Sequence, residues 1–105
     1  MTFKLYTAGG YEEFQSRIAD IPSGRITALF TGSKLLSTGL SWCPDCVKAE
    51  PVVEKVINEK EVQALDVSYV IVFVGNKEEW KNPECVFRTD PKLKLTCIPT
   101  LLDYA

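Results

Sequence analysis

The chain has 105 residues, of which 46% are hydrophobic and 25% are charged, and its formal net charge at pH 7 is −2. These values predict one small globular domain over residues 1–105, and the weak negative charge argues against nucleic-acid binding. No apolar run approaches the ~20 residues that a membrane span needs. The absence of histidine excludes Cys–His and Ser–His catalysis and histidine metal ligands.

The first half of the chain is predicted to alternate strands and helices. Residues 2–6 alternate polar and apolar side chains and predict a strand, and residues 25–30 predict a buried strand. Residues 9–21 predict a helix, followed by a turn at residues 22–24. The apolar stripe of this helix consists of Tyr11, Phe14, Ile18 and Ile21. Residues 31–41, which are rich in glycine and hydroxyl side chains, predict a loop.

The second half continues this alternation. A helix is predicted from Cys43 to about Lys60, and Pro51 should kink it because proline lacks an N–H donor. The nearly continuous β-branched residues 67–74 predict a strand covered on both faces. The remaining segments are a polar loop at residues 75–84, a short helix and a return to the sheet at residues 85–95, and a strand in residues 96–104. The order predicts an α/β fold with a central, largely parallel sheet.

The N-terminal segment predicts the compartment of the protein, and the compartment bears on the redox state of its cysteines. The opening MTFKLYTAGGYEEF lacks the apolar core and the cleavage site of a secretory signal peptide, so we expect a cytosolic protein. Cytosolic thiols are kept reduced, and a cysteine pair there is more often catalytic or metal-binding than a structural disulfide. The four cysteines are therefore the first candidates for function.

Cys43 and Cys46, within WCPDC at residues 42–46, are the main candidate site. Cys43 falls at a predicted helix start, where unpaired N–H groups and the helix dipole favour an anion. Such a position can lower a thiol pKa from about 8.5 to roughly 7 or below. Cys46 lies one turn later on the same side and should be more buried. The pattern predicts that Cys43 attacks a disulfide and that Cys46 resolves the mixed disulfide.

The residues around the two cysteines are expected to shape the site. Trp42 offers a flat apolar surface beside the sulfur, and Pro44 stiffens the first helical turn. Asp45 suits a helix start, yet its charge would oppose a second anion nearby. Whether Asp45 is a simple helix-start charge or handles protons stays open.

Three features together resemble the thioredoxin fold. They are the WCxxC motif, Pro51 five residues after the second cysteine, and Ile98-Pro99-Thr100 at the start of a late strand. The resemblance implies a three-layer fold in which Pro99 is a cis proline lying against the cysteine pair. It also implies that the backbone of Ile98 is free to pair with an extended substrate.

The match narrows to one family. WCPDC, together with FTGSK, VGNKEEWKNPE and IPTLL, is similar to the family of the thioredoxin-related protein of 14 kDa, also called thioredoxin domain-containing protein 17. The resemblance runs from about Tyr11 to Tyr104. It implies a cytosolic, monomeric reductase of cystine and selected protein disulfides with no bound cofactor. Electrons would come from NADPH through thioredoxin reductase. The residues that it assigns to the site are Cys43 as nucleophile, Cys46 as resolver, and Trp42, Pro44, Asp45, Ile98 and Pro99 around them.

The same resemblance implies that the final strand and the C-terminal helix are missing, about twenty residues by typical element lengths. We therefore expect residues 100–104 to form a sheet edge and one sheet face to lose its cover. The loop at residues 31–41 should restrict large partners.

Two other interpretations remain. The domain could be a non-catalytic binding module that docks a partner through the groove at Trp42 and Ile98. It could instead hold a structural zinc ion, with Cys85 and Cys97 completing a four-cysteine set, although these two lack the tight spacing of a second C-x-x-C. Otherwise Cys85 and Cys97 are expected to be ordinary thiols, with Cys97 near the site because it lies close to Pro99.

Overall fold

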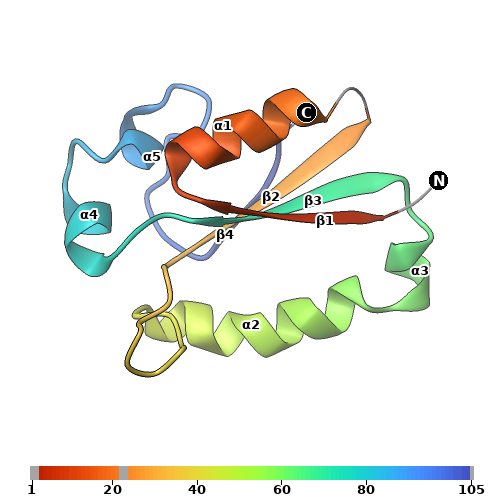
Figure 1. Ribbon diagram of the computed structural model, residues 1–105, viewed down its shortest axis with the longest axis horizontal. Helices are drawn as coiled ribbons and strands as arrows, with labels where there is room; N and C mark the ends of the chain where they lie inside the picture. Colours follow the sequence, from red (N-terminus) through yellow and green to blue (C-terminus); the bar gives the residue numbers. More distant parts are fainter. Residues whose placement is uncertain (1–2, 22–23, 105) are drawn as a thin grey trace.

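A four-stranded sheet in the order β1-β3-β2-β4 organises the computed structural model, which describes residues 3–21 and 24–104 (Figure 1). β3 pairs in parallel with β1 and with β2, and β4 is the antiparallel neighbour of β2 at the sheet edge. The largely parallel sheet and the edge position of the last strand are both confirmed. The strands are β1 (Lys4–Gly9), β2 (Arg25–Thr31), β3 (Val67–Phe73) and β4 (Thr100–Asp103).

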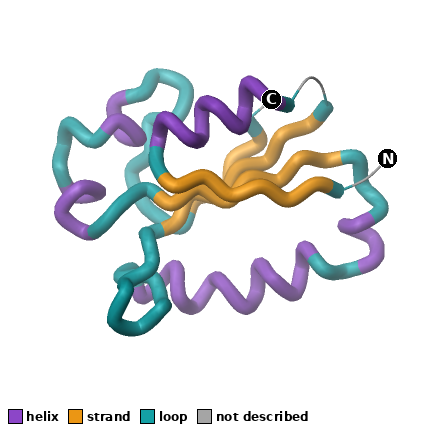
Figure 2. The backbone as a smooth tube through the Cα atoms, viewed as in Figure 1, coloured by secondary structure: helices purple, strands orange, loops and turns teal. Residues whose placement is uncertain are grey.

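The two longest helices cover opposite faces of this sheet and make three layers (Figure 2). Figure 1 shows α1 on one face and α2 on the other, so the predicted α/β three-layer arrangement is confirmed. None of the helices in the described part of the chain is long and apolar enough to cross a membrane. The helices are α1 (Tyr11–Asp20), α2 (Pro44–Ile57), α3 (Lys60–Gln63), α4 (Lys77–Lys81) and α5 (Val86–Thr89).

The α1 side of the sheet holds the main hydrophobic core. Phe14 of α1 is fully buried, and its ring meets those of Phe30 and Tyr104 edge to face, each at a centroid distance of 5.3 Å. Val70 and Val72 of the central strand are fully buried in the same cluster. Burial of large apolar surface is the main driving force of folding, so this cluster fixes the sheet beneath the site.

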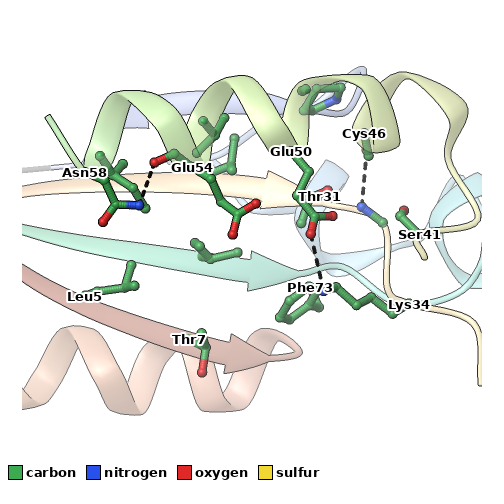
Figure 3. Close-up of a pocket in the computed structure, with 17 residues that line it drawn as sticks. Leu5, Thr7, Thr31, Lys34, Ser41, Cys46, Glu50, Glu54, Asn58 and Phe73 are labelled. Atoms are coloured by element: carbon green, nitrogen blue, oxygen red, sulfur yellow. Dashed lines mark hydrogen bonds and ion pairs between the residues drawn. The ribbon is translucent and has the colours of Figure 1, made fainter. Parts of the chain in front are cut away.

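The α2 side is packed less completely. A second buried cluster contains Leu29, Ile57 and Tyr69. Beside it, a groove of about 330 Å³ opens between α2 and the sheet (Figure 3), and Leu5 is 52% exposed there. The expected loss of cover is therefore only partial, because α2 still lies on this face beside the open groove.

Several element boundaries differ from the sequence predictions. The first strand runs on to Gly9, and the long helix ends at Ile57, with α3 as a separate short turn of helix. α2 continues through Pro51 without ending there. Residues 2, 22 and 23, which were included in a predicted strand and turn, lie outside the described residues.

The polar loop predicted at residues 75–84 is wrong, because α4 forms within it. The side-chain oxygen of Asn76 accepts a hydrogen bond from the backbone N–H of Glu79, and the carboxylate of Glu79 accepts one from the backbone N–H of Asn76. This capping box satisfies the free N–H groups that would otherwise destabilise so short a helix. Trp80 is buried and the guanidinium of Arg88 stacks over its ring, so these contacts pack the helix against the rest of the protein.

The predicted return to the sheet before residue 95 is also wrong. Residues 91–95 form a turn and a loop, in which Leu93 and Leu95 are buried while Lys92 and Lys94 are exposed. The alternation of lysine and leucine therefore reflects a turn with its leucines packed inward. A strand face was the wrong interpretation of this pattern.

Candidate active site

The N-terminus of α2 brings the two cysteines of WCPDC together. Cys43 is the N-cap residue with an extended backbone, and Pro44 occupies the first helical turn, where its missing N–H costs nothing. The sulfur of Cys43 accepts a hydrogen bond from the backbone N–H of Cys46, with N and Sγ 3.3 Å apart. Both side chains are buried, Cys43 with 6% and Cys46 with 2% exposure. The expected order of burial is confirmed.

Burial dominates the electrostatics of the Cys43 sulfur. Burial raises the pKa of the Cys43 thiol above its ordinary value, and a side-chain hydrogen bond with Cys46 raises it further. Backbone N–H groups of Cys46 and Asp45 lower this pKa, but they do not outweigh the loss of water around the sulfur. The sequence leaves open which effect dominates at this sulfur, and in the structure burial dominates. A helix N-terminus favours the thiolate only to the extent that the sulfur stays solvated.

A cis peptide bond joins Ile98 to Pro99 and lies against the cysteine pair. The thiol of Cys43 is a weak hydrogen-bond donor to the carbonyl oxygen of Ile98, with the sulfur and the oxygen 3.9 Å apart. Pro99 lines the groove in Figure 3 together with Cys46. The cis proline that the resemblance implied, and its position beside the cysteines, are confirmed. The structure places Ile98 itself in the core, with 9% exposure.

Trp42 anchors the motif to the sheet. Its indole N–H donates to the carbonyl oxygen of Gly75 at 2.8 Å, and its backbone N–H donates to Ser33 at 3.3 Å. The ring is half-buried and packs against the main core. Trp42 thus combines packing against the core with a position next to Cys43 in the chain.

Pro44 and Asp45 are both exposed at the start of α2. The carboxylate of Asp45 lies in the first turn, where it suits the helix dipole, and its backbone N–H faces Cys43. The geometry accounts for Asp45 as a helix-start charge, and a proton-handling role stays a prediction.

Sequence reasoning missed two residues of the site, Gly32 and Ser41. The hydroxyl of Ser41 accepts a hydrogen bond from the backbone N–H of Cys43 at 3.1 Å. The backbone N–H of Gly32 donates to the sulfur of Cys46 at 3.4 Å. Both lie in the loop before the motif, whose glycine and hydroxyl content predicted only its irregular backbone. Main-chain contacts of this kind leave no spacing pattern in a sequence.

The loop that precedes the motif stands beside the site. An antiparallel bridge between Lys34 and Ser41 closes it, and an ion pair of 3.5 Å joins Lys34 to Glu50 of α2. Leu36 at its tip is fully exposed. The other exposed leucines of this loop are Leu35 and Leu40.

The remaining cysteines do not join a metal site. Cys85 is half-buried at the start of α5, and Cys97 is exposed, with its sulfur 3.9 Å from the hydroxyl of Thr100. Within residues 3–21 and 24–104, no three side chains of the metal-ligating kinds His, Cys, Asp or Glu gather closely enough to hold an ion. The zinc interpretation is wrong for this reason.

Comparison with known sequences now places the chain in a family. Residues 7–105 match the model of the family described as thioredoxin domain-containing protein 17-like, thioredoxin domain. The chain belongs to this family. It is similar to thioredoxin domain-containing protein 17 of Mus musculus, with 43% identity over 103 residues that cover 98% of this chain and 79% of the mouse protein. The Homo sapiens protein of the same name is 41% identical over 102 residues, covering 97% of this chain and 78% of the human one.

Membership in the thioredoxin domain-containing protein 17-like family confirms the resemblance drawn from the sequence and the thioredoxin-like fold. A plant relative, the thioredoxin-like protein Clot of Arabidopsis thaliana, is 39% identical over 74 residues, covering 70% of this chain and 53% of the plant protein. In this member of the family, a buried pair of free thiols lies at the start of α2 beside a cis proline.

Proposed function

We propose that the chain is a dithiol–disulfide reductase. The Cys43 thiolate attacks one sulfur of a substrate disulfide, so that a Cys43–substrate disulfide forms and the other substrate sulfur leaves as a thiolate. Cys46 then loses its proton to solvent and attacks the sulfur of Cys43. The second substrate thiolate leaves, and a Cys43–Cys46 disulfide remains. The protein has then given two electrons to the substrate.

The position of the Cys43 sulfur is the observation that carries this proposal. It lies 3.3 Å from the backbone nitrogen of Cys46, a donor that can stabilise a thiolate. It also lies 3.9 Å from the carbonyl oxygen of Ile98, in the segment that contains the cis proline. An attacking sulfur, a resolving thiol and a backbone edge for the substrate therefore meet at one place.

The electron source and the substrates belong to the same proposal. A flavoprotein, thioredoxin reductase, would return the pair to the dithiol with electrons from NADPH, so the chain needs no cofactor of its own. The slight exposure of Cys43 and the projecting loop at residues 34–40 favour cystine and selected protein disulfides over bulky ones. The chain would act as a cytoplasmic monomer without nucleic acid or membrane.

NADPH consumption tests this function directly. With thioredoxin reductase and cystine, the wild-type chain should oxidise NADPH, and Cys43→Ser should reduce the rate by at least about a hundredfold because the nucleophile is gone. Cys97→Ser is the matched control, since it removes an exposed thiol outside the pair. Equal turnover by the wild-type and Cys43→Ser chains would disprove the assignment.

The exposed leucines of the loop before the motif support a second candidate, a non-catalytic binding module. Leu36 is fully exposed close to Trp42 and Ser41 in the chain, and exposed apolar side chains beside a groove often mark protein contacts. Calorimetry with an apolar peptide that contains no sulfur would test this role. An affinity that ignores oxidation and Cys43→Ser, but falls in Leu36→Asp, would favour binding over reduction.

A further inference from the structure

The backbone N–H of Gly32 points at the second sulfur of the pair. Figure 3 shows this contact as a dashed line to Cys46, and the distance between N and Sγ is 3.4 Å. Cys46 is the more buried of the two thiols, with 2% exposure, so water does little to stabilise charge on its sulfur. A main-chain donor aimed at that sulfur therefore provides stabilisation that the solvent does not.

The segment around Gly32 is fixed on both sides. Before it, the carbonyl oxygen of Thr31 accepts from the backbone N–H of Val74 at 2.9 Å. After it, Ser33 donates through its backbone N–H to Gly75 at 3.1 Å. The donor is therefore held in place before any reaction begins. Hydrogen-bond donors that need no reorganisation are the most effective at stabilising developing charge.

The close packing at this point also requires glycine. A Cβ atom on Gly32 would lie 2.7 Å from the hydroxyl oxygen of Ser41 and 3.0 Å from two atoms of the Trp42 ring. Both neighbours are already engaged, Ser41 with the N–H of Cys43 and Trp42 with Gly75. Neither can move without disturbing the motif. Glycine thus allows the N–H of residue 32 to approach the sulfur of Cys46.

We propose that the N–H of Gly32 stabilises negative charge on Cys46 and so assists the resolving step. This inference rests on the proposed reductase function. As Cys46 loses its proton and attacks the sulfur of Cys43, the hydrogen bond from Gly32 stabilises the negative charge that develops on the Cys46 sulfur. The charge then passes to the leaving substrate thiolate as the Cys43–Cys46 bond forms.

An amide-to-ester exchange tests the donor without filling the space. Glycolic acid at position 32, introduced by chemical ligation of the full chain, replaces this N–H with an oxygen and adds no atoms. The same exchange at Gly9 is the matched control, because the N–H of Gly9 also bonds a side chain, that of Glu13, away from the site. Cys85→Ser and Cys97→Ser in all chains leave only the active pair to react.

The reagent is 5,5′-dithiobis(2-nitrobenzoate), an aromatic disulfide whose thiolate product is coloured. Attack by Cys43 releases one coloured thiolate, and resolution by Cys46 releases the second, so the two steps are two phases of colour. The first phase should be unchanged in the position-32 ester. The second phase should be about threefold slower at pH 7, because the charge on the Cys46 sulfur loses one hydrogen-bond donor and a more nucleophilic sulfur offsets only part of that loss.

The pH profile separates this role from a structural one. The rate of the second phase in the position-32 ester should be below that of the Gly9 control near neutral pH. At sufficiently high pH it should equal or exceed the control rate. An unchanged second phase, or equal slowing of both phases at every pH, would overturn the inference alone. A parent chain that forms no Cys43–Cys46 disulfide would overturn the proposed function and this inference with it.

Discussion

The two pairs of cysteines in this chain differ in how the fold holds them. Cys43 and Cys46 are both buried. The sulfur of Cys43 accepts a hydrogen bond from the backbone N–H of Cys46, and the sulfur of Cys46 accepts one from the backbone N–H of Gly32. Cys85 and Cys97 are more accessible, and the sulfur of Cys97 makes a weak contact of 3.9 Å with the hydroxyl of Thr100. The difference shows that the presence of cysteines alone does not define a candidate redox site in this chain. The backbone N–H donors and the burial of their sulfurs distinguish Cys43 and Cys46 from the other two cysteines.

Removing the anchor behind the first pair should have the largest effect. Trp42→Ala deletes a half-buried ring and its hydrogen bond to Gly75, so the free energy of unfolding should fall by about 2–4 kcal/mol. Chemical denaturation measures this change. Leu36→Ala, at an exposed position in the neighbouring loop, is the control and should change stability by less than about 0.5 kcal/mol. Similar losses in both variants would show that Trp42 does not anchor the motif.

The pH dependence of the first pair should be the next largest effect. Burial raises the pKa of the Cys43 thiol, so the thiolate is the minor form at pH 7 and its share grows as the pH rises toward that pKa. The rate of disulfide attack should therefore rise about tenfold per pH unit above pH 7. Stopped-flow measurement of the first phase provides the profile. A rate of disulfide attack that no longer rises with pH above pH 7 would mean that the helix N-terminus outweighs burial in setting the pKa of Cys43.

Changes to the second pair should have the smallest effect. Cys97→Ser and Cys85→Ser should leave cystine turnover within about twofold of wild type, since neither thiol contacts the reacting sulfurs in the described structure. Steady-state NADPH assays measure this. A large loss in Cys97→Ser alone would show that this thiol, one residue before Ile98, takes part in the reaction.

Much of the fold was predictable from periodicity in the sequence. The apolar stripe around Phe14 and the β-branched run from Val67 each gave the correct element, because burial on one or both faces leaves a repeating pattern. The short helix α4 was missed, because its stability comes from the capping box between Asn76 and Glu79. The helix is too short for a helical period of apolar residues to appear in the sequence.

The candidate site was predictable in position and less so in its electrostatics. The spacing of Cys43 and Cys46 and the family resemblance located the pair and its cis proline. The direction of the Cys43 pKa shift could not be predicted, because it depends on burial by the whole fold, which a motif does not encode. The contact from Gly32 could not be predicted, because every residue type except proline carries a backbone N–H.

Trapping the first intermediate tests the central claim most directly. Cys46→Ser removes the resolving sulfur, so one turnover with cystine should stop at a disulfide between Cys43 and a single cysteine. Peptide mapping by mass spectrometry without reduction identifies the modified residue. The account predicts that this adduct is on Cys43 and that wild-type protein instead forms a Cys43–Cys46 disulfide. An adduct on Cys85 or Cys97, with Cys43 left as a free thiol, would contradict it.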